Sequence, residues 1–437
     1  LPVARLTGER GRTCGQLRLF AQTVREGSWV DARIDTALPE RQPAPRPDIR
    51  RMLKGIGPVV VFGSSNFPLA FSTAGGDTAS ALAAGCPVVV KAHRAHPGTA
   101  ELVGGVIARA AAECGLPPGV FSLIHGGGST IGVALVRHPA TAAVGFTGSR
   151  VAGRALFDVA AARERPISVF AEMSSLNPVF LLPDAMAERS ESIAQGLFAS
   201  FTLGVGQFCT KPGLVFALRG AATDRFVATL SKLVEGAQPG TMLTPDIRAA
   251  FETERAHVLS IDGVSRVTAA VAVADAGRTQ ASPSIAKTDA ARFLAAPELA
   301  TEAFGPFALL ILADGMEQMV ACARALDGQL TATVHATPAD LSGAAALLDA
   351  AEQRAGRLVI NSFPTGVEVS PAMNHGGPYP ATSDVRHTSV GTAAMLRFAR
   401  PHCYQGYPDA LLPAALRNAN PLGIQRLVDG RLTRDAL

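Results

Sequence analysis

The stretch Gly206-Gln207-Phe208-Cys209-Thr210-Lys211-Pro212-Gly213 separates a helical pattern from a strand pattern. Residues 191–203 place apolar side chains at helical spacing, and the apolar run 214–218 is typical of a strand. A cysteine at a break flanked by Gly and Pro can be partly exposed in a cleft, as a nucleophilic thiol must be. A lone cysteine is more often a buried apolar side chain, so its role depends on the surrounding residues.

Composition indicates a globular protein. The chain has 437 residues, 48% of them hydrophobic, which favours two domains with a cleft between them. Its 40 Lys and Arg against 36 Asp and Glu leave a net charge of only +4, and the basic residues are dispersed, which argues against nucleic-acid binding. The six cysteines are scattered, so we expect reduced thiols in a cytoplasmic protein. The first residues lack a leader pattern and no apolar run is long enough to span a membrane, so no membrane partner is expected.

Strand and helix patterns alternate from Gly57 onward. We expect strands at 58–63, 87–91, 120–124 and 142–147, and helices at 70–84, 99–114, 130–137 and 152–162. This alternation predicts an α/β fold with a parallel sheet covered on both faces, and a second α/β block from about Asn177 to Gly391. The Pro-rich segment 37–48 is expected to lie between two extended segments, and the C-terminal tail shows little periodicity.

Polar residues follow several of these strands at the edge where open α/β sheets bind ligands. Lys91 ends one strand. Gly148, Ser149 and Gly153 lie between a strand and a helix, where free N–H groups and the helix dipole attract a pyrophosphate. That signal is weak alone, because the G-x-G-x-x-G fingerprint of an ordinary dinucleotide-binding fold is absent.

Three further residues could carry chemistry. Glu172 leaves an apolar strand for a polar turn, where burial would raise its pKa and suit it as a general base; an exposed strand-end glutamate is the alternative. Asn66 follows the first strand, and its amide could donate to an oxyanion or form only a local turn. Glu302 precedes a Gly-Pro break and alone would be a surface acid.

Together these motifs resemble the aldehyde dehydrogenase family. The segments that carry the resemblance, in chain order, are Asn66-Phe67-Pro68, Lys91, Gly148-Ser149 with Gly153, Glu172, Gly206-Gln207 before Cys209, and Glu302-Ala303-Phe304-Gly305-Pro306. The resemblance covers essentially the whole chain. Segments 66–72, 74–78, 207–210 and 375–382 look like the α-ketoglutaric semialdehyde dehydrogenase branch, which also includes NADP-dependent fatty aldehyde dehydrogenases.

The resemblance implies the aldehyde dehydrogenase fold in three units. Residues 1–30 and 55–173 would form a Rossmann-like NAD(P)-binding domain, and residues 174–394 an α/β catalytic domain. Residues 31–54 and 395–437 would form a small β-excursion for oligomerisation, in a homodimer or homotetramer. Relatives usually carry a further helical segment before the position that matches Leu1, so we expect the first part of the cofactor domain to be missing.

The resemblance assigns the catalytic chemistry to three residues. Cys209 is expected to attack the aldehyde carbon to give a thiohemiacetal, while Asn66 and the Cys209 backbone N–H hold the oxyanion. Hydride transfer to the nicotinamide would leave a thioester, which water activated by Glu172 would hydrolyse to the acid. A covalent intermediate divides one difficult step into two easier ones, and oriented donors stabilise charge as it forms.

The resemblance also implies a nicotinamide cofactor. The expected contacts are Lys91 with ribose or phosphate, Gly148, Ser149 and Gly153 with the pyrophosphate, Glu302 with the nicotinamide ribose, and Phe304 in the nicotinamide pocket. Many relatives have a glutamate three residues after the lysine, which would repel a 2′-phosphate. This chain has Arg94 there, so we expect a preference for NADP, with NAD as the alternative. Ser174-Ser175 stands where a Gly pair commonly follows the base, which would stiffen that loop.

The branch resemblance implies oxidation of a small semialdehyde, 2,5-dioxopentanoate, to 2-oxoglutarate. The alternatives are a broad-specificity or fatty aldehyde dehydrogenase, a CoA-acylating enzyme, and a catalytically silent oligomeric or cofactor-binding protein. Glu172 argues against the CoA enzyme, because CoA-linked relatives generally lack that base. An anionic substrate also needs a cation near the active site, and the sequence alone does not select which arginine supplies it.

Other motifs carry no chemistry in this interpretation. His93 and His96 lie three residues apart without a third ligand, so no metal site is expected. The absence of a G-x-S-x-G motif argues against a serine hydrolase. Cys86 and Cys114 lie in apolar or helical surroundings and are expected to be buried thiols.

Overall fold

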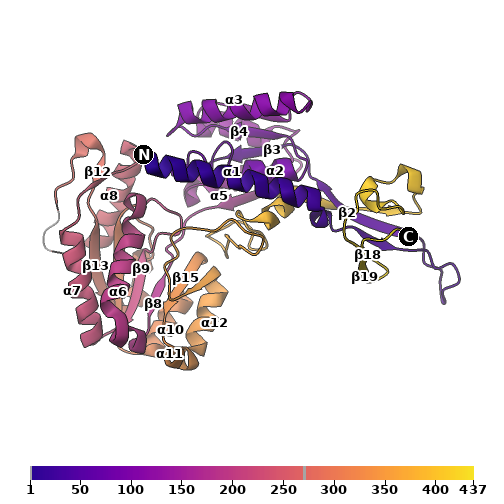
Figure 1. Cartoon of the computed structure of the whole chain (residues 1–437). Coiled ribbons are helices and arrows are strands. Elements are labelled where there is room, and N and C mark those ends of the chain that lie inside the picture. The colour runs from indigo at the N-terminus through magenta and orange to yellow at the C-terminus, as the bar shows by residue number, and fades with distance from the viewer. Residues whose placement is uncertain (1, 269–271) are drawn as a thin grey trace.

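The computed structural model describes residues 2–268 and 272–437, and its strands form three main sheets (Figure 1). The first is a parallel five-stranded sheet in the order β5-β4-β3-β6-β7. Its strands are β3 (Val59–Phe62), β4 (Val88–Lys91), β5 (Phe121–Ile124), β6 (Ala143–Thr147) and β7 (Ser168–Glu172). The strand order reverses between β3 and β6, and open α/β sheets bind ligands in the crevice at such a reversal.

Helices cover both faces of this sheet, as the alternation predicts. They are α2 (Gly76–Ala83), α3 (Pro97–Glu113), α4 (Val133–Arg137) and α5 (Arg150–Ala161). Val59 and Val61 pack with α2 on one face, while Val60 and Phe62 pack with α4 and α5 on the other. Successive residues of a strand face opposite ways, so a strand buried on both faces is continuously apolar.

Two predicted helices begin later than the sequence pattern indicates. The helix predicted at 70–84 begins at Gly76, because residues 70–75 form turns and Gly75 is extended. The helix predicted at 130–137 begins with a wider turn at Gly128–Gly132 and becomes α-helical only at Val133. In both places closely spaced glycines precede the helix, and glycine favours turns over helix.

The second sheet has seven strands in the order β11-β13-β14-β9-β8-β15-β16, parallel except for β11. Its strands are β8 (Val179–Leu181), β9 (Leu214–Leu218), β11 (Ser265–Arg266), β13 (Ser284–Asp289), β14 (Phe307–Ala313), β15 (Gln329–His335) and β16 (Ala355–Ile360). Its helices are α6 (Pro183–Thr202), α7 (Ala221–Glu235), α8 (Pro245–Ser260), α9 (Ala290–Ala295), α10 (Met316–Ala325), α11 (Pro338–Gly343) and α12 (Ala345–Arg354). The apolar side chains of α6 and α7 pack on one face, and those of α9, α10 and α12 on the other. A short ribbon, β10 (Gly240–Thr241) with β12 (Gln280–Ala281), stands apart.

The third sheet projects from the two α/β blocks (Figure 1) and joins distant parts of the chain in the order β17-β2-β1-β18-β19. It consists of β1 (Arg33–Asp35), β2 (Ile49–Gly55), β17 (Ala399–Gln405), β18 (Arg426–Val428) and β19 (Arg431–Thr433). The sequence analysis assigns no strand to the C-terminal tail. The longest strand of the tail, β17, pairs antiparallel with β2, from Ala399 opposite Gly55 to Gln405 opposite Ile49. No local sequence pattern reveals this long-range pairing.

Helix α1 (Val3–Glu26) lies across the front of the first sheet in Figure 1 and contacts α2. Its buried residues include the polar side chains Glu9, Thr13 and Gln16. Glu9 accepts a hydrogen bond from the Leu69 N–H at 3.3 Å, and Thr13 donates to the Glu9 carbonyl at 2.9 Å. Arg5 of the same helix donates to the Asn66 carbonyl, so α1 contacts the loop after β3.

Two further observations bear on the sequence analysis. Cys86 is buried as expected, but Cys114 is exposed, because it follows the end of α3 at a helix terminus that reaches solvent. Within residues 2–268 and 272–437, no helix combines the length and apolar composition that a membrane crossing requires.

Candidate active site

Cys209 lies in a loop whose backbone requires glycine. The loop follows α6 and the short helical turn Leu203–Gly206, in which Gly206 has a φ of +67°. A Cβ at Gly206 would lie 2.3 Å from the backbone of Gly305, so another residue there forces the two segments apart. This close approach places the half-buried Cys209 beside the segment that contains Glu302.

Gln207 and Asn66 fix the same loop. The Gln207 side chain accepts a hydrogen bond from the Leu243 N–H at 3.0 Å and donates to the Gly204 carbonyl at 3.0 Å. Asn66, which is buried in the loop after β3, donates from Nδ2 to the Gln207 carbonyl at 2.9 Å. An asparagine amide has two N–H donors, so one N–H of Asn66 remains for a ligand oxygen near Cys209.

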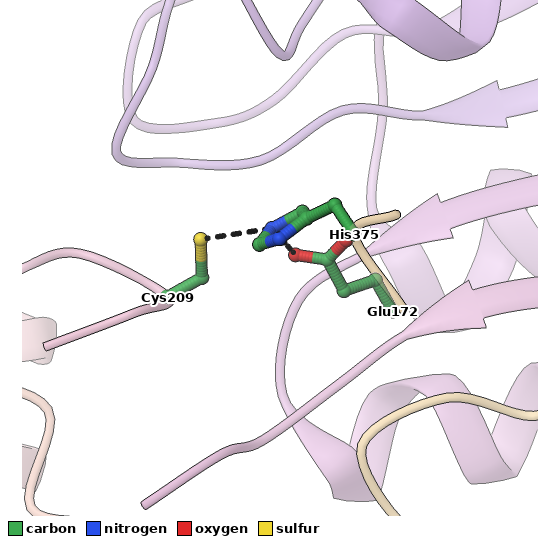
Figure 2. Close-up of side chains that lie close together, drawn as sticks. All are labelled: Glu172, Cys209 and His375. Carbon is green, nitrogen blue, oxygen red and sulfur yellow. Dashed lines mark hydrogen bonds and ion pairs between the residues drawn. The ribbon is translucent and has the colours of Figure 1, made fainter. Parts of the chain in front are cut away.

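Figure 2 shows His375 between the sulfur of Cys209 and the carboxylate of Glu172. The distances from His375 Nε2 are 3.4 Å to Cys209 Sγ and 3.1 Å to Glu172 Oε1. The His375 side chain is fully buried, and Glu172 is 5% exposed, so the exposed alternative for Glu172 is wrong. Cys209, His375 and Glu172, which are far apart in the sequence, thus form one continuous series of contacts.

The loop 375–389 supplies the rest of this arrangement. The backbone of Glu172 bridges Thr382, and the Met173 N–H donates to the Ala381 carbonyl at 2.8 Å, which anchors the loop to the end of β7. Ser389 donates its hydroxyl hydrogen to Glu172 Oε2. Each carboxylate oxygen of Glu172 therefore has one partner, His375 or Ser389.

The charges in this cluster depend on one another. Burial disfavours the charge on His375, but Glu172 and the Cys209 thiolate outweigh it and raise the pKa of His375 to about 10. Burial also disfavours the charge on Glu172, yet His375, Ser389 and Arg397 hold its pKa below the ordinary value. The predicted rise in the pKa of Glu172 is therefore wrong, because burial is only one of the influences on it and the sequence does not reveal the cation beside it.

Glu172, Cys209 and His375 also form a group whose donor atoms lie within 4.8 Å of one another, a spacing that could hold a metal ion. However, His375 Nε2 already contacts both the sulfur and the carboxylate, so the one N–H on that nitrogen is shared between them, and Nδ1 has no hydrogen-bond partner among the described residues. We interpret the group as an acid–base cluster, and the prediction that no metal is bound stays a prediction.

Of the predicted cofactor residues, those from the first block (Lys91, Arg94, Gly148, Ser149 and Gly153) lie at the carboxyl edge of the first sheet. Lys91 ends β4 and is 9% exposed, and among the described residues no carboxylate oxygen lies within 4.0 Å of its ammonium. Burial and then the charge of Arg94 lower the pKa of Lys91. The exposed Arg94 lies 3.0 Å from Asp246 of α8, so it reaches from the first block to the second.

The Gly148–Gly153 turn is built for close packing. Ser149 caps α5 by accepting from the Ala152 N–H at 3.4 Å. A Cβ at Gly148 would lie 2.7 Å from the Phe146 ring, and one at Gly153 would lie 2.8 Å from Met173. These glycines therefore allow α5 to begin directly beside the end of β7.

Glu302 is not a free surface acid. Burial raises its pKa to about 7, against the opposing effects of Lys211, the Ser174 hydroxyl and the Ser175 N–H. Lys211 donates to the carbonyls of Ala303 at 3.1 Å and Phe307 at 2.9 Å, and burial lowers its pKa to about 8 although Glu302 opposes that shift. Ser174, which departs from the family pattern, is thus a direct partner of Glu302. The predicted Phe304 is half-buried in the same segment.

The structure places the sequence-predicted residues in two groups. Asn66, Glu172 and Cys209 meet around the thiol, whereas Lys91, Arg94 and Ser149 lie along the strand ends. Sequence reasoning missed His375, Ser389 and the helix α1. The segment 375–382 is part of the resemblance, but nothing in its pattern indicates that its histidine points at the cysteine.

Comparison with known proteins agrees with this geometry. The aldehyde dehydrogenase family model matches residues 2–379, and the chain therefore belongs to the aldehyde dehydrogenase family, as the sequence motifs indicate. The chain is 54% identical over 433 residues to alpha-ketoglutaric semialdehyde dehydrogenase 2 of Azospirillum brasilense, covering 99% of this chain and 82% of that protein. It is 49% identical over 436 residues to alpha-ketoglutaric semialdehyde dehydrogenase of Acinetobacter baylyi, again covering 82% of that protein.

Solved structures confirm the predicted fold. Glyceraldehyde-3-phosphate dehydrogenase GapN of Methanocaldococcus jannaschii, solved in complex with NADP, superposes with a TM-score of 0.75 at 20% identity over 92% of this chain and 82% of that chain. PnpE of a Pseudomonas species superposes with a TM-score of 0.74 at 20% identity over 91% of this chain and 77% of that chain. The chain is thus an aldehyde dehydrogenase, a family that uses nicotinamide cofactors.

Proposed function

We propose that this enzyme oxidises α-ketoglutaric semialdehyde to 2-oxoglutarate with NADP, through a thioester on Cys209. The substrate is inferred from the two relatives, of 54% and 49% identity, that bear that name. The contact chain from Cys209 through His375 to Glu172 is the observation that supports the chemistry most strongly.

The first step is attack of the Cys209 thiolate on the aldehyde carbon. Nε2 of His375, 3.4 Å from the sulfur, can donate a hydrogen bond to the attacking thiolate. As the carbon–sulfur bond forms, the carbonyl oxygen becomes an oxyanion, and the free N–H of Asn66 with the Cys209 backbone N–H would stabilise it. The product of this step is a thiohemiacetal.

The second half of the reaction returns the thiol. The thiohemiacetal would lose hydride to a nicotinamide cofactor held by the strand-end residues, which would leave a thioester on Cys209. Glu172 then takes a proton from water, the water oxygen bonds to the acyl carbon, and the carbon–sulfur bond breaks to release the acid and the Cys209 thiolate. Because His375 and Ser389 hold Glu172 ionised, it is ready to accept that proton.

The residues at the strand ends fit a dinucleotide. Lys91 is a nearly buried cation without a carboxylate partner within 4.0 Å among the described residues, so a phosphate or ribose hydroxyl would satisfy it. Ser149 lies at the N-terminus of α5, where the helix dipole favours a pyrophosphate. Gly148, Gly153, Glu302 and Phe304 are assigned to the cofactor on the family resemblance.

The preference for NADP is inferred from Arg94. Its partner Asp246 is 69% exposed and Arg94 itself 78% exposed, and ion pairs so exposed contribute little. Arg94 can therefore leave Asp246 and pair with a 2′-phosphate at a small cost in free energy. A guanidinium can donate two parallel hydrogen bonds to a phosphate.

Steady-state oxidation of α-ketoglutaric semialdehyde and of hexanal, each with NADP and with NAD, tests this proposal. We expect the highest kcat/KM for the semialdehyde with NADP. A higher kcat/KM for hexanal would favour a fatty or broad-specificity enzyme, dependence on CoA would indicate acyl transfer, and no turnover of either would indicate a silent protein.

We further propose that the third sheet joins copies of this chain into a homodimer or homotetramer in the cytoplasm. The sheet projects from the blocks that carry the site (Figure 1), and its strands β17 and β19 lie at its two edges. Light scattering after gel filtration tests this; a monomer at micromolar concentration would contradict it.

A further inference from the structure

Two arginines near Cys209 have no role in the mechanism described above. Arg12 lies on α1, and Arg357 lies on β16, far away in the sequence. Burial lowers the pKa of both, and in both cases the charge of the Cys209 thiolate opposes that shift.

Contacts place both guanidinium groups beside the Cys209 loop. Arg12 lies over the Phe71 ring, which contacts Phe67, and the Phe67 ring contacts Phe208, the residue before Cys209. Arg357 donates to the Pro364 carbonyl, and the hydroxyl of the next residue, Thr365, donates to the carbonyl of Thr210, the residue after Cys209.

Both arginines also carry unused donors. The Nε and Nη2 atoms of Arg12 and the Nε atom of Arg357 are buried without a hydrogen-bond partner among the described residues. Arg357 uses Nη2 to donate to the Pro364 carbonyl at 2.8 Å, and Arg12 stacks over the Phe71 ring at 4.9 Å. A buried donor without an acceptor costs free energy, so a ligand that supplies acceptors to these donors would gain binding free energy.

Neighbouring acids do not neutralise Arg12. Glu9 and Glu368 influence its charge, but no oxygen of either lies within 4.0 Å of it among the described residues. Burial raises the pKa of Glu9 to about 7, against the opposing effects of the Leu69 N–H, Arg5 and Arg12, so Glu9 carries only part of its charge at neutral pH. The positive charge of Arg12 is therefore available to pair with an anionic ligand.

Arg5, on the same helix, also has a buried Nε without a hydrogen-bond partner among the described residues, but the rest of its guanidinium is engaged. It donates from Nη2 to the Asn66 carbonyl and lies over the rings of Phe67 at 5.1 Å and Phe208 at 5.2 Å. Arg5 therefore supports the loop of Asn66, while Arg12, two helical turns further on, presents its donors to the region of Cys209.

We propose that Arg12 and Arg357 bind the distal carboxylate of the aldehyde substrate and so select short oxo-carboxylates over neutral aldehydes. A guanidinium matches a carboxylate with two parallel hydrogen bonds, and its charge is weakly hydrated, which suits a buried site. The aldehyde carbon must reach Cys209, so cations beside the Cys209 loop suit a short chain with an acid at its far end. This inference rests on the proposed function, because the carboxylate is that of the semialdehyde.

The test compares R12M, R357M and R12K with R18M, a matched change at an exposed arginine of the same helix. Each variant is assayed with α-ketoglutaric semialdehyde and with pentanal, a neutral aldehyde of the same length. We expect R12M to lower kcat/KM for the semialdehyde about 30-fold or more, mainly through KM, because a buried charge pair loses one partner. The kcat/KM of R12M for pentanal should change less than about threefold. For the semialdehyde, the kcat/KM of R12K should lie between those of R12M and the unaltered enzyme, and the kcat/KM of R18M should equal that of the unaltered enzyme.

The outcomes separate this inference from the proposed function. An equal loss with both aldehydes would show that Arg12 acts on Cys209 or on the fold, and unchanged use of the semialdehyde would show that it does not bind the carboxylate; either overturns the inference. If the unaltered enzyme oxidises pentanal but not the semialdehyde, the proposed function fails instead.

A binding readout keeps the inference testable if R12M does not fold. Glutarate, a dicarboxylate that cannot react, should slow alkylation of Cys209 by iodoacetamide in the unaltered enzyme. In R357M the glutarate concentration that gives half protection should rise about tenfold or more. Equal protection of R357M and the unaltered enzyme would contradict the role of Arg357.

Discussion

Nε2 of His375 lies 3.4 Å from Sγ of Cys209, and Oε1 of Glu172 lies 3.1 Å from the same nitrogen. The nucleophile and the general base of the proposed mechanism are therefore connected through one imidazole. Changing the charge on any member of the three alters the other two, and the predictions below follow from that coupling.

Replacing His375 with Gln should reduce the reactivity of Cys209. The variant keeps a hydrogen-bonding group of similar reach but loses the positive charge of His375, which lies 3.4 Å from the sulfur and would stabilise the attacking thiolate. We expect the rate of alkylation by iodoacetamide at about pH 7 to fall about tenfold or more. H125Q, at an exposed histidine paired with Glu101, is the control and should react like the unaltered enzyme. Equal rates in H375Q and H125Q would contradict the proposed thiolate–imidazolium pair.

The same contact should make stability depend on pH. The pKa of His375 is raised from 6.5 to about 10 in the folded protein, so protonation of His375 favours folding. Its contribution is complete below about pH 6.5 and is lost as the pH rises toward 10. The free energy of unfolding, measured with urea, should therefore fall more steeply with rising pH in the unaltered protein than in H375Q between about pH 7 and about pH 9.5. Parallel curves for the two proteins would count against a charged His375.

Arg94 and Asp246 allow a paired test of cofactor choice. R94A should lower kcat/KM for NADP by about tenfold or more, since a charge-assisted pair with the 2′-phosphate is lost, and should leave NAD nearly unchanged. D246A frees Arg94 from its exposed partner and should not reduce the use of NADP. A similar loss with both cofactors in R94A would remove the argument for an NADP preference.

Gly206 should be intolerant of a side chain. Its φ is +67°, and a Cβ would lie 2.3 Å from the Gly305 backbone, so G206A should lower stability by about 2 kcal/mol or more and displace Cys209. G8A, on α1 where nothing lies within 4 Å of the new methyl group, should instead stabilise the protein by about 0.5–1 kcal/mol. Thermal unfolding measures both, and equal melting temperatures for the two variants would contradict this packing.

The sequence predicts the strands of the first sheet and the residues around Cys209 well, because both are local patterns. Val88–Lys91 is a continuous apolar run ending in a charge, and the Cys209 loop is marked by its own Gly and Pro residues. The sequence does not predict β17, because its pairing with β2 joins residues more than three hundred positions apart. For the same reason no local pattern reveals the contact of His375 with Cys209 or the contact of Arg12 with the Phe71 ring. The lowered pKa of Glu172 likewise depends on a cation known only from the fold.

Trapping the covalent intermediate tests the central claim most directly. E172Q removes the proposed base but leaves the nucleophile, so mixing it with α-ketoglutaric semialdehyde and NADP should give one burst of NADPH and then stalled turnover. Mass spectrometry of the quenched protein should then find the acyl group on the peptide that contains Cys209. Sustained turnover by E172Q with no acyl group on Cys209 would contradict the account.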